Sequence, residues 1–258
     1  MTLGTDLDGQ AGIWAVSLGV LGAIVGSFVA ALVLRWTEDR SVISGRSACD
    51  SCGRTLATID LVPVLSFVAL RGRCRTCHAP IDRRHLIIEL LAVTIGLVAG
   101  LTSPGPAGAA GAVFGWLLLA LGALDLAAFW LPDRLTATLA AIGLATGLAG
   151  IAPDLEERLW GGIAGFGVLW LIGEGYRRFR GREGLGGGDP KLFGAIGLWL
   201  GWRLLPAVLL IASLIGLGVV MGAALRGRPL ARDAALPFGV FLAAAAYPAW
   251  VAIIGFAV

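Results

Sequence analysis

Residues 108–132 read GAAGAVFGWLLLALGALDLAAFWLP, an apolar run of 25 residues with a single charge, Asp125. About 20 apolar residues are enough for a helix to cross the hydrocarbon core of a bilayer. The rest of the chain is similar, since 57% of its 258 residues are hydrophobic and only 14% are charged. Soluble domains carry about 25% charged residues. The composition therefore predicts an all-α integral membrane protein and excludes disulfide-rich secreted, collagenous and disordered chains.

Eight membrane spans are expected, at 13–35, 86–103, 108–132, 135–153, 159–176, 191–204, 206–225 and 235–258. The sixth and seventh could instead form one helix over 191–225. At about 1.5 Å per residue such a helix would be near 50 Å long, too long for a single crossing. Gly201-Trp202-Arg203 and Pro206 are therefore expected to break it.

The basic residues predict the orientation of these spans. Eighteen of the 20 lysines and arginines fall on alternate connections, and only Arg158 and Arg203 fall on the other side. Because cytoplasmic loops carry the excess of positive charge, both termini are expected in the periplasm and the long loop 36–84 in the cytoplasm. The expected organisation is a first transmembrane helix (1–35), a cytoplasmic loop (36–84) and a transmembrane core (85–258) in a bacterial inner (cytoplasmic) membrane.

All four cysteines lie in the loop 36–84, as two C-x2-C pairs separated by 21 residues: Cys49, Cys52, Cys74 and Cys77. Each pair can present two thiolates from one tight turn, and two such turns make a tetrahedral Zn²⁺ site. Disulfides, redox chemistry and inert thiols are the alternatives, and the reducing cytoplasm disfavours disulfides. Four cysteine ligands leave no open position for a catalytic water, so the zinc is expected to be structural. His78 is interpreted as an exposed neighbour of Cys77 rather than a ligand.

Asp125 is a carboxylate inside an expected span, where a charge costs roughly 2.5–3.5 kcal/mol. Its neighbours are apolar, no basic residue lies within one helical turn, and Pro132 follows seven residues later. That spacing places Asp125 roughly 10 Å below the cytoplasmic end of the span. Such a residue indicates a functional site, with a structural helix–helix hydrogen bond as the alternative.

Asp189 follows a glycine-rich turn and precedes Pro190 and Lys191. Glycines at 184, 186, 187 and 188 let the backbone approach another segment closely and adopt positive φ angles. Pro190 favours a helix start, so an N-cap role for Asp189 is the structural alternative to catalysis. A phosphate-binding loop is disfavoured, because the G-x4-G-K-[ST] spacing is absent.

Asp125 and Asp189 are both expected near the cytoplasmic face. Two carboxylates that share one water and one proton form an acid/base pair suited to peptide hydrolysis, because neighbouring like charges cannot both ionise cheaply. Among the other acidic residues, Asp133 is interpreted as a cap or interfacial residue and Glu89 as an interfacial partner of Arg84.

Further motifs occur along nearly the whole chain: Gly26-Ser27-Phe28 with Arg35, Arg46-Ser47 before the first cysteine pair, Asp60-Leu61-Val62-Pro63, Arg84 with Glu89, Asp125-Leu126 with Leu131-Pro132-Asp133, Gly186-Gly187-Gly188-Asp189-Pro190-Lys191, and Pro237-Phe238-Gly239. Together they resemble the prepilin peptidases of type IV pilus and type II secretion systems, the bacterial branch of the GxGD membrane aspartyl proteases.

The resemblance implies cleavage of a short basic leader from prepilins or pseudopilins at the cytoplasmic membrane face, after a glycine and ahead of a hydrophobic helix. It implies that Asp125 and Asp189 are the catalytic pair, and that Gly186, Gly187, Gly188 and Lys191 form the active-site loop. It also leaves open N-methylation of the new N-terminus with S-adenosylmethionine as cofactor. The chain departs from the family pattern at Ala30, within the N-terminal segment that the resemblance associates with methylation.

A proton-coupled transporter with Asp125 as the proton relay is the rival interpretation. It predicts inverted repeats and paired broken helices, whereas the sequence has one broken region, at 201–206, and no internal repeat. The expected partners are prepilin-like substrates and the lipid bilayer, with no nucleic acid.

Overall fold

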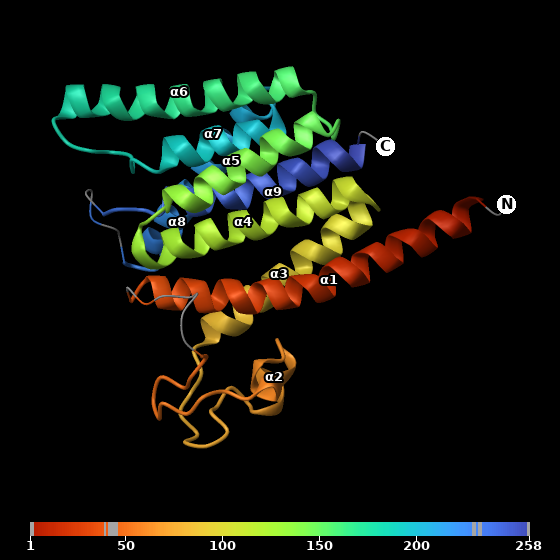
Figure 1. The fold of residues 1–258 in the computed structure, drawn as a ribbon. Helices are drawn as coiled ribbons and strands as arrows, with labels where there is room; N and C mark the ends of the chain where they lie inside the picture. The colour runs from red at the N-terminus through yellow and green to blue at the C-terminus, as the bar shows by residue number, and fades with distance from the viewer. Residues whose placement is uncertain (1–2, 39, 41–45, 229–230, 232–233, 257–258) are drawn as a thin grey trace. The chain divides into compact units, whose positions relative to one another are not determined.

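The computed structural model describes residues 3–38, 40, 46–228, 231 and 234–256. Within these residues all regular structure is helical, apart from two isolated β-bridges in the cysteine loop (Figure 1). The chain divides into two compact units, Met1–Ala120 and Leu121–Val258. Arg232, which belongs to the seventh expected connection, and residues 257–258 of the eighth expected span lie outside the described residues.

Each expected span corresponds to one long helix of the described chain: α1 (Leu3–Trp36), α3 (Arg83–Thr102), α4 (Pro106–Ala128), α5 (Asp133–Leu148), α6 (Leu155–Arg180), α7 (Asp189–Leu200), α8 (Leu205–Leu225) and α9 (Phe238–Phe256). Among the described residues, five helices are long and apolar enough to cross a membrane, namely α1, α3, α4, α8 and α9. At about 1.5 Å per residue, the 16 residues of α5 and the 12 of α7 fall short of a hydrocarbon core. Eight complete crossings therefore stay a prediction.

In the first unit, α1 and α3 pack with their backbones in direct contact (Figure 1). A Cβ atom on Gly22 would lie 2.3 Å from the carbonyl oxygen of Ala92, and one on Gly96 would lie 2.2 Å from that of Leu18. No larger residue fits at either position. Small residues allow this close approach between membrane helices, and van der Waals contact then holds the two helices together.

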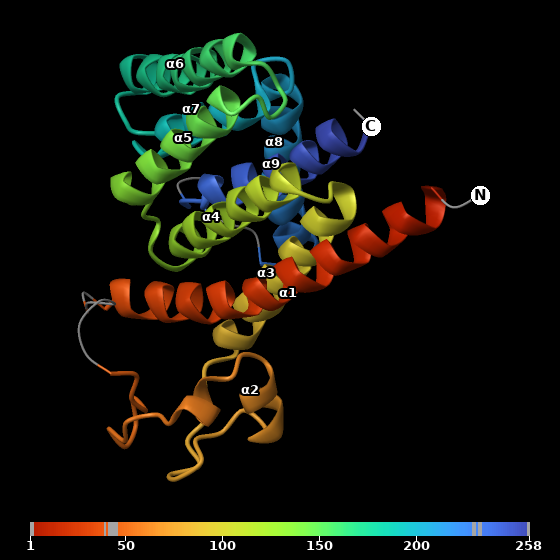
Figure 2. The ribbon, with the colours of Figure 1, turned by 45° about the vertical axis from the view of Figure 1, so that its right-hand side comes forward.

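In the second unit, α7 is the central helix. Ten of its 12 residues are buried, including Asp189 at its start. Figure 2 shows α7 beside α5 and α6, and a Cβ on Gly197 would lie 2.1 Å from the Gly161 carbonyl oxygen of α6. Trp199 of α7 donates its indole N–H to the Leu139 carbonyl of α5 at 2.8 Å. These contacts fix the helix that carries Asp189.

Arg158 of α6 joins the ends of three helices. Its side chain is buried, and its guanidinium donates to five backbone carbonyls at 2.8–3.1 Å, those of Gly143, Ile151, Ala152, Pro153 and Leu198. Carbonyls near helix C-termini lack partners within the helix, so this one side chain satisfies groups that would otherwise be orphaned. The sequence showed only that Arg158 lies on one of the connections with few basic residues, which gave no indication of this role.

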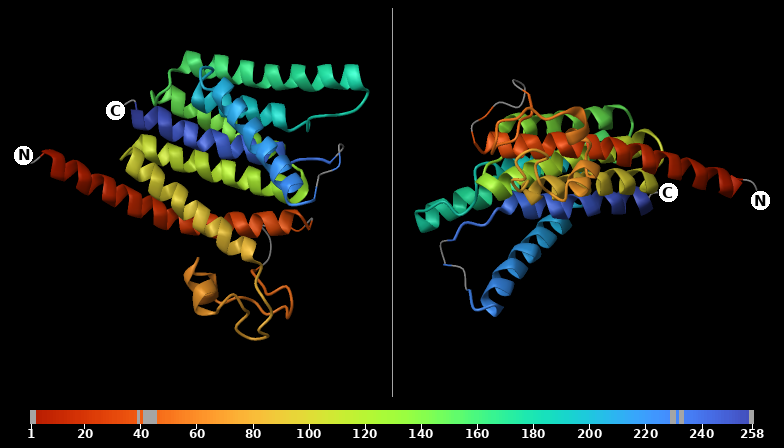
Figure 3. Two further views of the ribbon diagram at one scale, coloured as in Figure 1. Left: turned by 180° about the vertical axis from the view of Figure 1, so that it is seen from behind. Right: turned by 90° about the horizontal axis from the view of Figure 1, so that it is seen from below.

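The expected break before Pro206 is confirmed. Helix α7 ends at Leu200, Gly201 adopts a φ of 72°, and α8 starts at Leu205, so that α8 crosses α9 rather than continuing α7 (Figure 3).

The expected end of the third span is wrong. Helix α4 stops at Ala128, because Phe129 has a left-handed φ of 52° and the segment before Pro132 leaves the helical region. Asp125 thus lies in the last turn of α4, closer to the helix end than the sequence implied.

Candidate active site and metal centre

Asp125 is buried at the end of α4, with only 5% of its surface exposed. Its Oδ2 atom accepts a hydrogen bond from the backbone N–H of Val240, 3.0 Å away at the start of α9. A Cβ on the preceding residue, Gly239, would lie 2.8 Å from that same oxygen. Glycine at 239 therefore lets the backbone of α9 reach the carboxylate.

Asp189 is equally buried and is the first residue of α7. The N-cap interpretation is wrong, because the cap position is Gly188 and Asp189 already lies inside the helix, next to Pro190. Its Oδ2 accepts a hydrogen bond from the Gly186 N–H, 3.0 Å away in the preceding turn. The carboxylate thus closes the glycine turn and leaves the helix N-terminus uncapped by a side chain.

The glycines of the turn before Asp189 allow close packing and do not adopt a left-handed backbone conformation. None of Gly186, Gly187 and Gly188 has a positive φ, contrary to what the sequence suggested. A Cβ on Gly188 would lie 2.8 Å from the Cβ of Leu131, and one on Gly239 would lie 3.1 Å from the Cδ1 of Leu131. Leu131 therefore packs against glycines of both segments that hold the aspartates.

Both aspartates line a single cavity of about 190 Å³. Its other lining residues are Phe129, Trp130, Leu131, Asp133, Gly186, Gly187, Gly188 and Lys191. Lys191 forms an ion pair with Asp133, with its Nζ 2.7 Å from Oδ1, so this lysine is neutralised by a third carboxylate. In the described part of the chain, neither Asp125 nor Asp189 has a cationic partner. The cavity thus contains two buried carboxylates that lack ion-pair partners among the described residues, and it has room for water.

The sequence predicted the two aspartates but missed what orients Asp125. The Pro237-Phe238-Gly239 motif was the only signal, and it revealed neither the Val240 hydrogen bond nor the close approach of Gly239. The interpretation of Glu89 as a partner of Arg84 is also wrong. Arg84 pairs with Asp82 at 2.6 Å, whereas Glu89 accepts the backbone N–H of Val64 at 2.7 Å.

The four cysteines form the second candidate site. All are free thiols, and their sulfur atoms lie within 4.8 Å of one another. The Sγ atoms of Cys49 and Cys77 are 3.8 Å apart. A tetrahedron with Zn–S bonds of about 2.3 Å has sulfur–sulfur edges of about 3.8 Å, so the geometry fits zinc. Backbone N–H groups of Cys77 and Thr76 hold the pKa of the Cys74 thiol below its usual value, whereas burial and the neighbouring thiols raise the pKa of Cys77.

The two C-x2-C pairs adopt the same turn. In each, the N–H four residues after the first cysteine donates to that cysteine's carbonyl, from Gly53 at 2.9 Å and from His78 at 3.0 Å. Both residues have a positive φ, 70° for Gly53 and 57° for His78. His78 is exposed and lies outside the cluster, and its role as a non-ligand stays a prediction.

Asp60 ties the two turns together. Its carboxylate pairs with Arg54, just after the first cysteine pair, and with Arg75, inside the second, where Nε lies 2.8 Å from Oδ1. The side chain of Asp60 is only 4% exposed. The hydrogen bond from Arg75 holds the pKa of Asp60 below its usual value, so the carboxylate stays charged at neutral pH.

Comparison with known proteins assigns these sites to a family. The model of the bacterial peptidase A24 N-terminal domain matches residues 20–102, and that of the type IV leader peptidase family matches residues 112–221. A prepilin leader peptidase/N-methyltransferase of Burkholderia pseudomallei is 42% identical over 252 residues, covering 87% of this chain and 81% of its own length. The chain belongs to the type IV leader peptidase family.

Two further relatives carry the same description. The protein of Aeromonas hydrophila is 39% identical over 81% of this chain and 71% of its own, and that of Stutzerimonas stutzeri is 32% identical over 91% and 88%. No solved structure matches the chain. The leader peptidase match contains both aspartates and the glycine turn, and the N-terminal match contains the four cysteines. With its five candidate spans, this member of the family is a multi-pass membrane protein.

Proposed function

We propose that this protein is an intramembrane aspartyl endopeptidase that removes the basic leader from prepilins or pseudopilins. The observation that carries the proposal is the pair of buried carboxylates, Asp125 and Asp189, which share one cavity without cations. The names of the relatives supply the substrate class. Transport through Asp125 has no such support, either from the family or from a second broken helix among the described residues.

The two carboxylates divide the proton chemistry of peptide hydrolysis between them. One, ionised, takes a proton from a water held in the cavity, and that water attacks the scissile carbonyl carbon. The other, protonated, donates to the carbonyl oxygen and then to the leaving amine. The hydrogen bonds from Val240 and Gly186 each hold one carboxylate oxygen in place beside the cavity. A substrate helix hides its carbonyls, so the scissile segment must enter extended, beside the glycine turn.

The remaining elements of the proposal concern the membrane and the metal. The basic residues support an inner-membrane protein with eight crossings, periplasmic termini and cytoplasmic carboxylates. The loop 36–84 is proposed as a cytoplasmic domain, with the core at 85–258. Cys49, Cys52, Cys74 and Cys77 would hold one structural Zn²⁺, whose role is to fix the loop and not to react.

Cleavage by purified protein in detergent tests the proposal. The substrate is a prepilin whose basic leader ends in glycine, and the enzymes are wild type, Asp125→Ala, Asp189→Ala and Asp154→Asn, which alters an exposed carboxylate outside the cavity. Wild type and Asp154→Asn are expected to cut after the glycine, whereas the other two are expected to be inactive with full zinc content. Cleavage by either alanine variant would refute the catalytic pair, and failure of wild type to cut would refute the peptidase itself.

A further inference from the structure

Two oppositely charged side chains, Asp133 and Lys191, pair at the cavity that contains Asp125 and Asp189. Asp133 is the first residue of α5, and Lys191 lies in the first turn of α7, two residues after Asp189. Both line the cavity, and the Nζ of Lys191 lies 2.7 Å from Oδ1 of Asp133. The side chain of Lys191 is 49% exposed and that of Asp133 is 73% exposed, whereas Asp125 and Asp189 are each only 5% exposed. The ion pair therefore lies at the solvent-facing rim of the cavity.

Lys191 occupies a position where its own helix disfavours a cation. The N-terminus of an α-helix carries a partial positive charge, which stabilises acidic side chains nearby and destabilises basic ones. In the described part of the chain, Asp133 is the one carboxylate that pairs with this lysine. Asp133 does not cap its own helix, because the N-cap of α5 is Pro132. Its carboxylate is instead used to hold the ammonium group.

Lys191 is also the one basic residue among the described residues that line the cavity. Lysine carries a compact ammonium group on a flexible four-carbon stem. Without Asp133, nothing among the other lining residues would keep this group at the rim. The nearest negative charges left in the cavity would then be those of Asp125 and Asp189, which have no ion-pair partner in the described chain.

A cation beside the two aspartates would remove the proton that peptide hydrolysis needs. Two neighbouring carboxylates share a proton because they cannot both ionise cheaply, whereas an adjacent ammonium group favours the ionised form of each. With both ionised, a general base is present, but no general acid remains to protonate the leaving amine. Hydrolysis therefore requires that the ammonium group of Lys191 stay away from the pair.

We propose that Asp133 is a positioning residue, which holds the ammonium group of Lys191 at the rim of the cavity so that Asp125 and Asp189 keep the proton they share. The inference rests on the proposed function, since it takes these two aspartates as the acid/base pair. Asp133 acts only through the lysine. Its removal is therefore harmful only while the lysine is present, and a second substitution at Lys191 reverses the harm.

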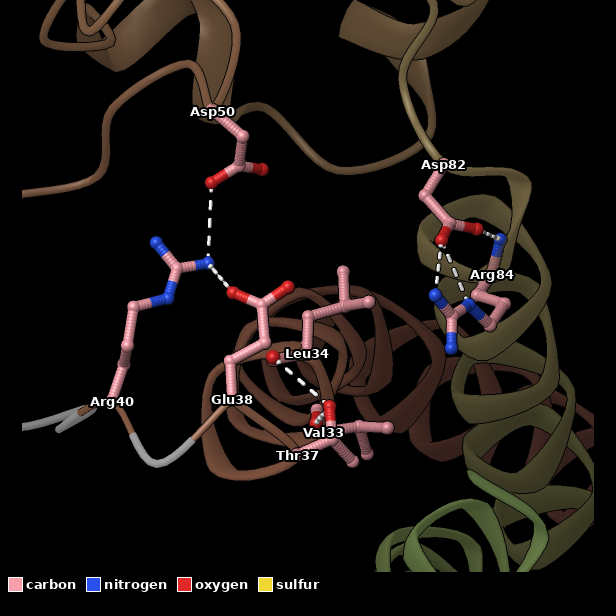
Figure 4. A network of polar contacts seen from close by, with 8 residues as sticks. All are labelled: Val33, Leu34, Thr37, Glu38, Arg40, Asp50, Asp82 and Arg84. Carbon is pink, nitrogen blue, oxygen red and sulfur yellow. Dashed lines mark hydrogen bonds and ion pairs between the residues drawn. The ribbon is translucent and has the colours of Figure 1, made fainter. Parts of the chain in front are cut away.

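The ion pair is not expected to matter for folding, because exposed ion pairs contribute little to stability. The first unit contains pairs of the same kind. Figure 4 shows Glu38 and Asp50 beside Arg40, at 2.6 and 3.2 Å. The side chains of Glu38 and Arg40 are 60% and 48% exposed, much like those of Asp133 and Lys191. Glu38→Ala is therefore a matched control, since it breaks a similarly exposed ion pair that does not line the 190 Å³ cavity.

Three variants of the full-length protein test the proposal: Asp133→Ala, Lys191→Met and the double variant. For each, kcat and KM are measured in detergent for a prepilin whose basic leader ends in glycine, with zinc content and thermal unfolding on the same samples. Asp133→Ala is expected to lose about 100-fold or more in kcat, the lower end for lost general acid catalysis, with KM within about threefold of wild type. Lys191→Met and the double variant are expected to stay within about tenfold of wild type, because neither has an ammonium group that favours ionisation of both carboxylates. Glu38→Ala is expected to keep the wild-type kcat.

Rescue by the second substitution distinguishes positioning of the lysine from a purely structural tie. If the ion pair only joined α5 to α7, the double variant would be as slow as Asp133→Ala or slower, and that result would overturn the inference. Wild-type kcat in Asp133→Ala, an inactive Lys191→Met, or an Asp133→Ala protein that lacks zinc or does not fold would overturn it as well. Wild type that fails to cleave would instead refute the proposed peptidase.

Discussion

Replacing Gly239 with alanine tests whether the backbone of α9 positions Asp125, one of the two proposed catalytic carboxylates. The added Cβ would lie 2.8 Å from Oδ2 and 3.1 Å from Cγ of Asp125, and 3.1 Å from Cδ1 of Leu131. Ordinary contact needs several tenths of an ångström more, so either the carboxylate or the start of α9 must move. Either movement lengthens the 3.0 Å hydrogen bond from Val240 to Asp125.

The size of the effect follows from that bond. A hydrogen bond to a charged group contributes about 1.5–3 kcal/mol, and each 1.36 kcal/mol is a factor of ten in rate. We therefore expect kcat for leader cleavage to fall by about 10- to 100-fold. Stability changes less, because the roughly 1 kcal/mol gained in helix propensity partly offsets an overpacking cost of about 1–3 kcal/mol.

The assay is steady-state cleavage of a prepilin in detergent, with thermal unfolding measured on the same samples. Gly218→Ala on α8 is the matched control, since no atom lies within 4 Å of its added Cβ and its helix gains the same propensity. The control is expected to keep the wild-type kcat. A kcat for Gly239→Ala within twofold of wild type would show that α9 does not position Asp125.

Three further predictions concern the metal centre and the buried arginine. His78→Gly is expected to retain one zinc per chain, since glycine suits the φ of 57° at this position, whereas Cys77→Ser is expected to lose the metal. Elemental analysis measures the zinc content of both variants, and loss of zinc from His78→Gly would show that His78 is a ligand. Asp60→Asn breaks the link between the two cysteine turns, so a chelator is expected to remove zinc several-fold faster than from wild type, and an unchanged rate would contradict this. Arg158→Met leaves five carbonyls without their donor and is expected to lower the free energy of unfolding by about 3 kcal/mol or more. Arg203→Met breaks an exposed ion pair and is expected to lower it by about 1 kcal/mol or less. Equal unfolding transitions of these two variants would contradict the role given to Arg158.

Hydropathy and ligand spacing were sufficient to predict the long helices, the cysteine cluster and Asp125 from the sequence. The positions of the long helices follow from runs of apolar residues, because a segment inside the bilayer must hydrogen-bond its own backbone groups and present apolar side chains to the lipid. The cysteine cluster follows from two short spacings, and Asp125 stands out because a lone charge in an apolar run is costly. All of these signals are local in sequence.

The features that could not be predicted depend on contacts between distant segments. Val240 lies 115 residues after Asp125, and no pattern near either residue indicates their hydrogen bond. Glu89 was assigned to its sequence neighbour Arg84 because the alternative donor, the Val64 N–H, becomes accessible only in a strained loop. The early end of α4 depends on a single left-handed residue, Phe129, whose side chain does not favour that conformation.

The most direct test of the central claim is a double-mutant cycle on the proposed catalytic pair, Asp125 and Asp189. Single-turnover cleavage of one prepilin is measured for wild type, Asp125→Asn, Asp189→Asn and the double variant, each with confirmed zinc content. Residues that act as a unit show grossly non-additive losses, so each single variant is expected to lose nearly as much activity as the double variant. If the two losses instead multiply, or if either single variant keeps substantial activity, Asp125 and Asp189 do not share one proton and one water, and the proposed mechanism is wrong.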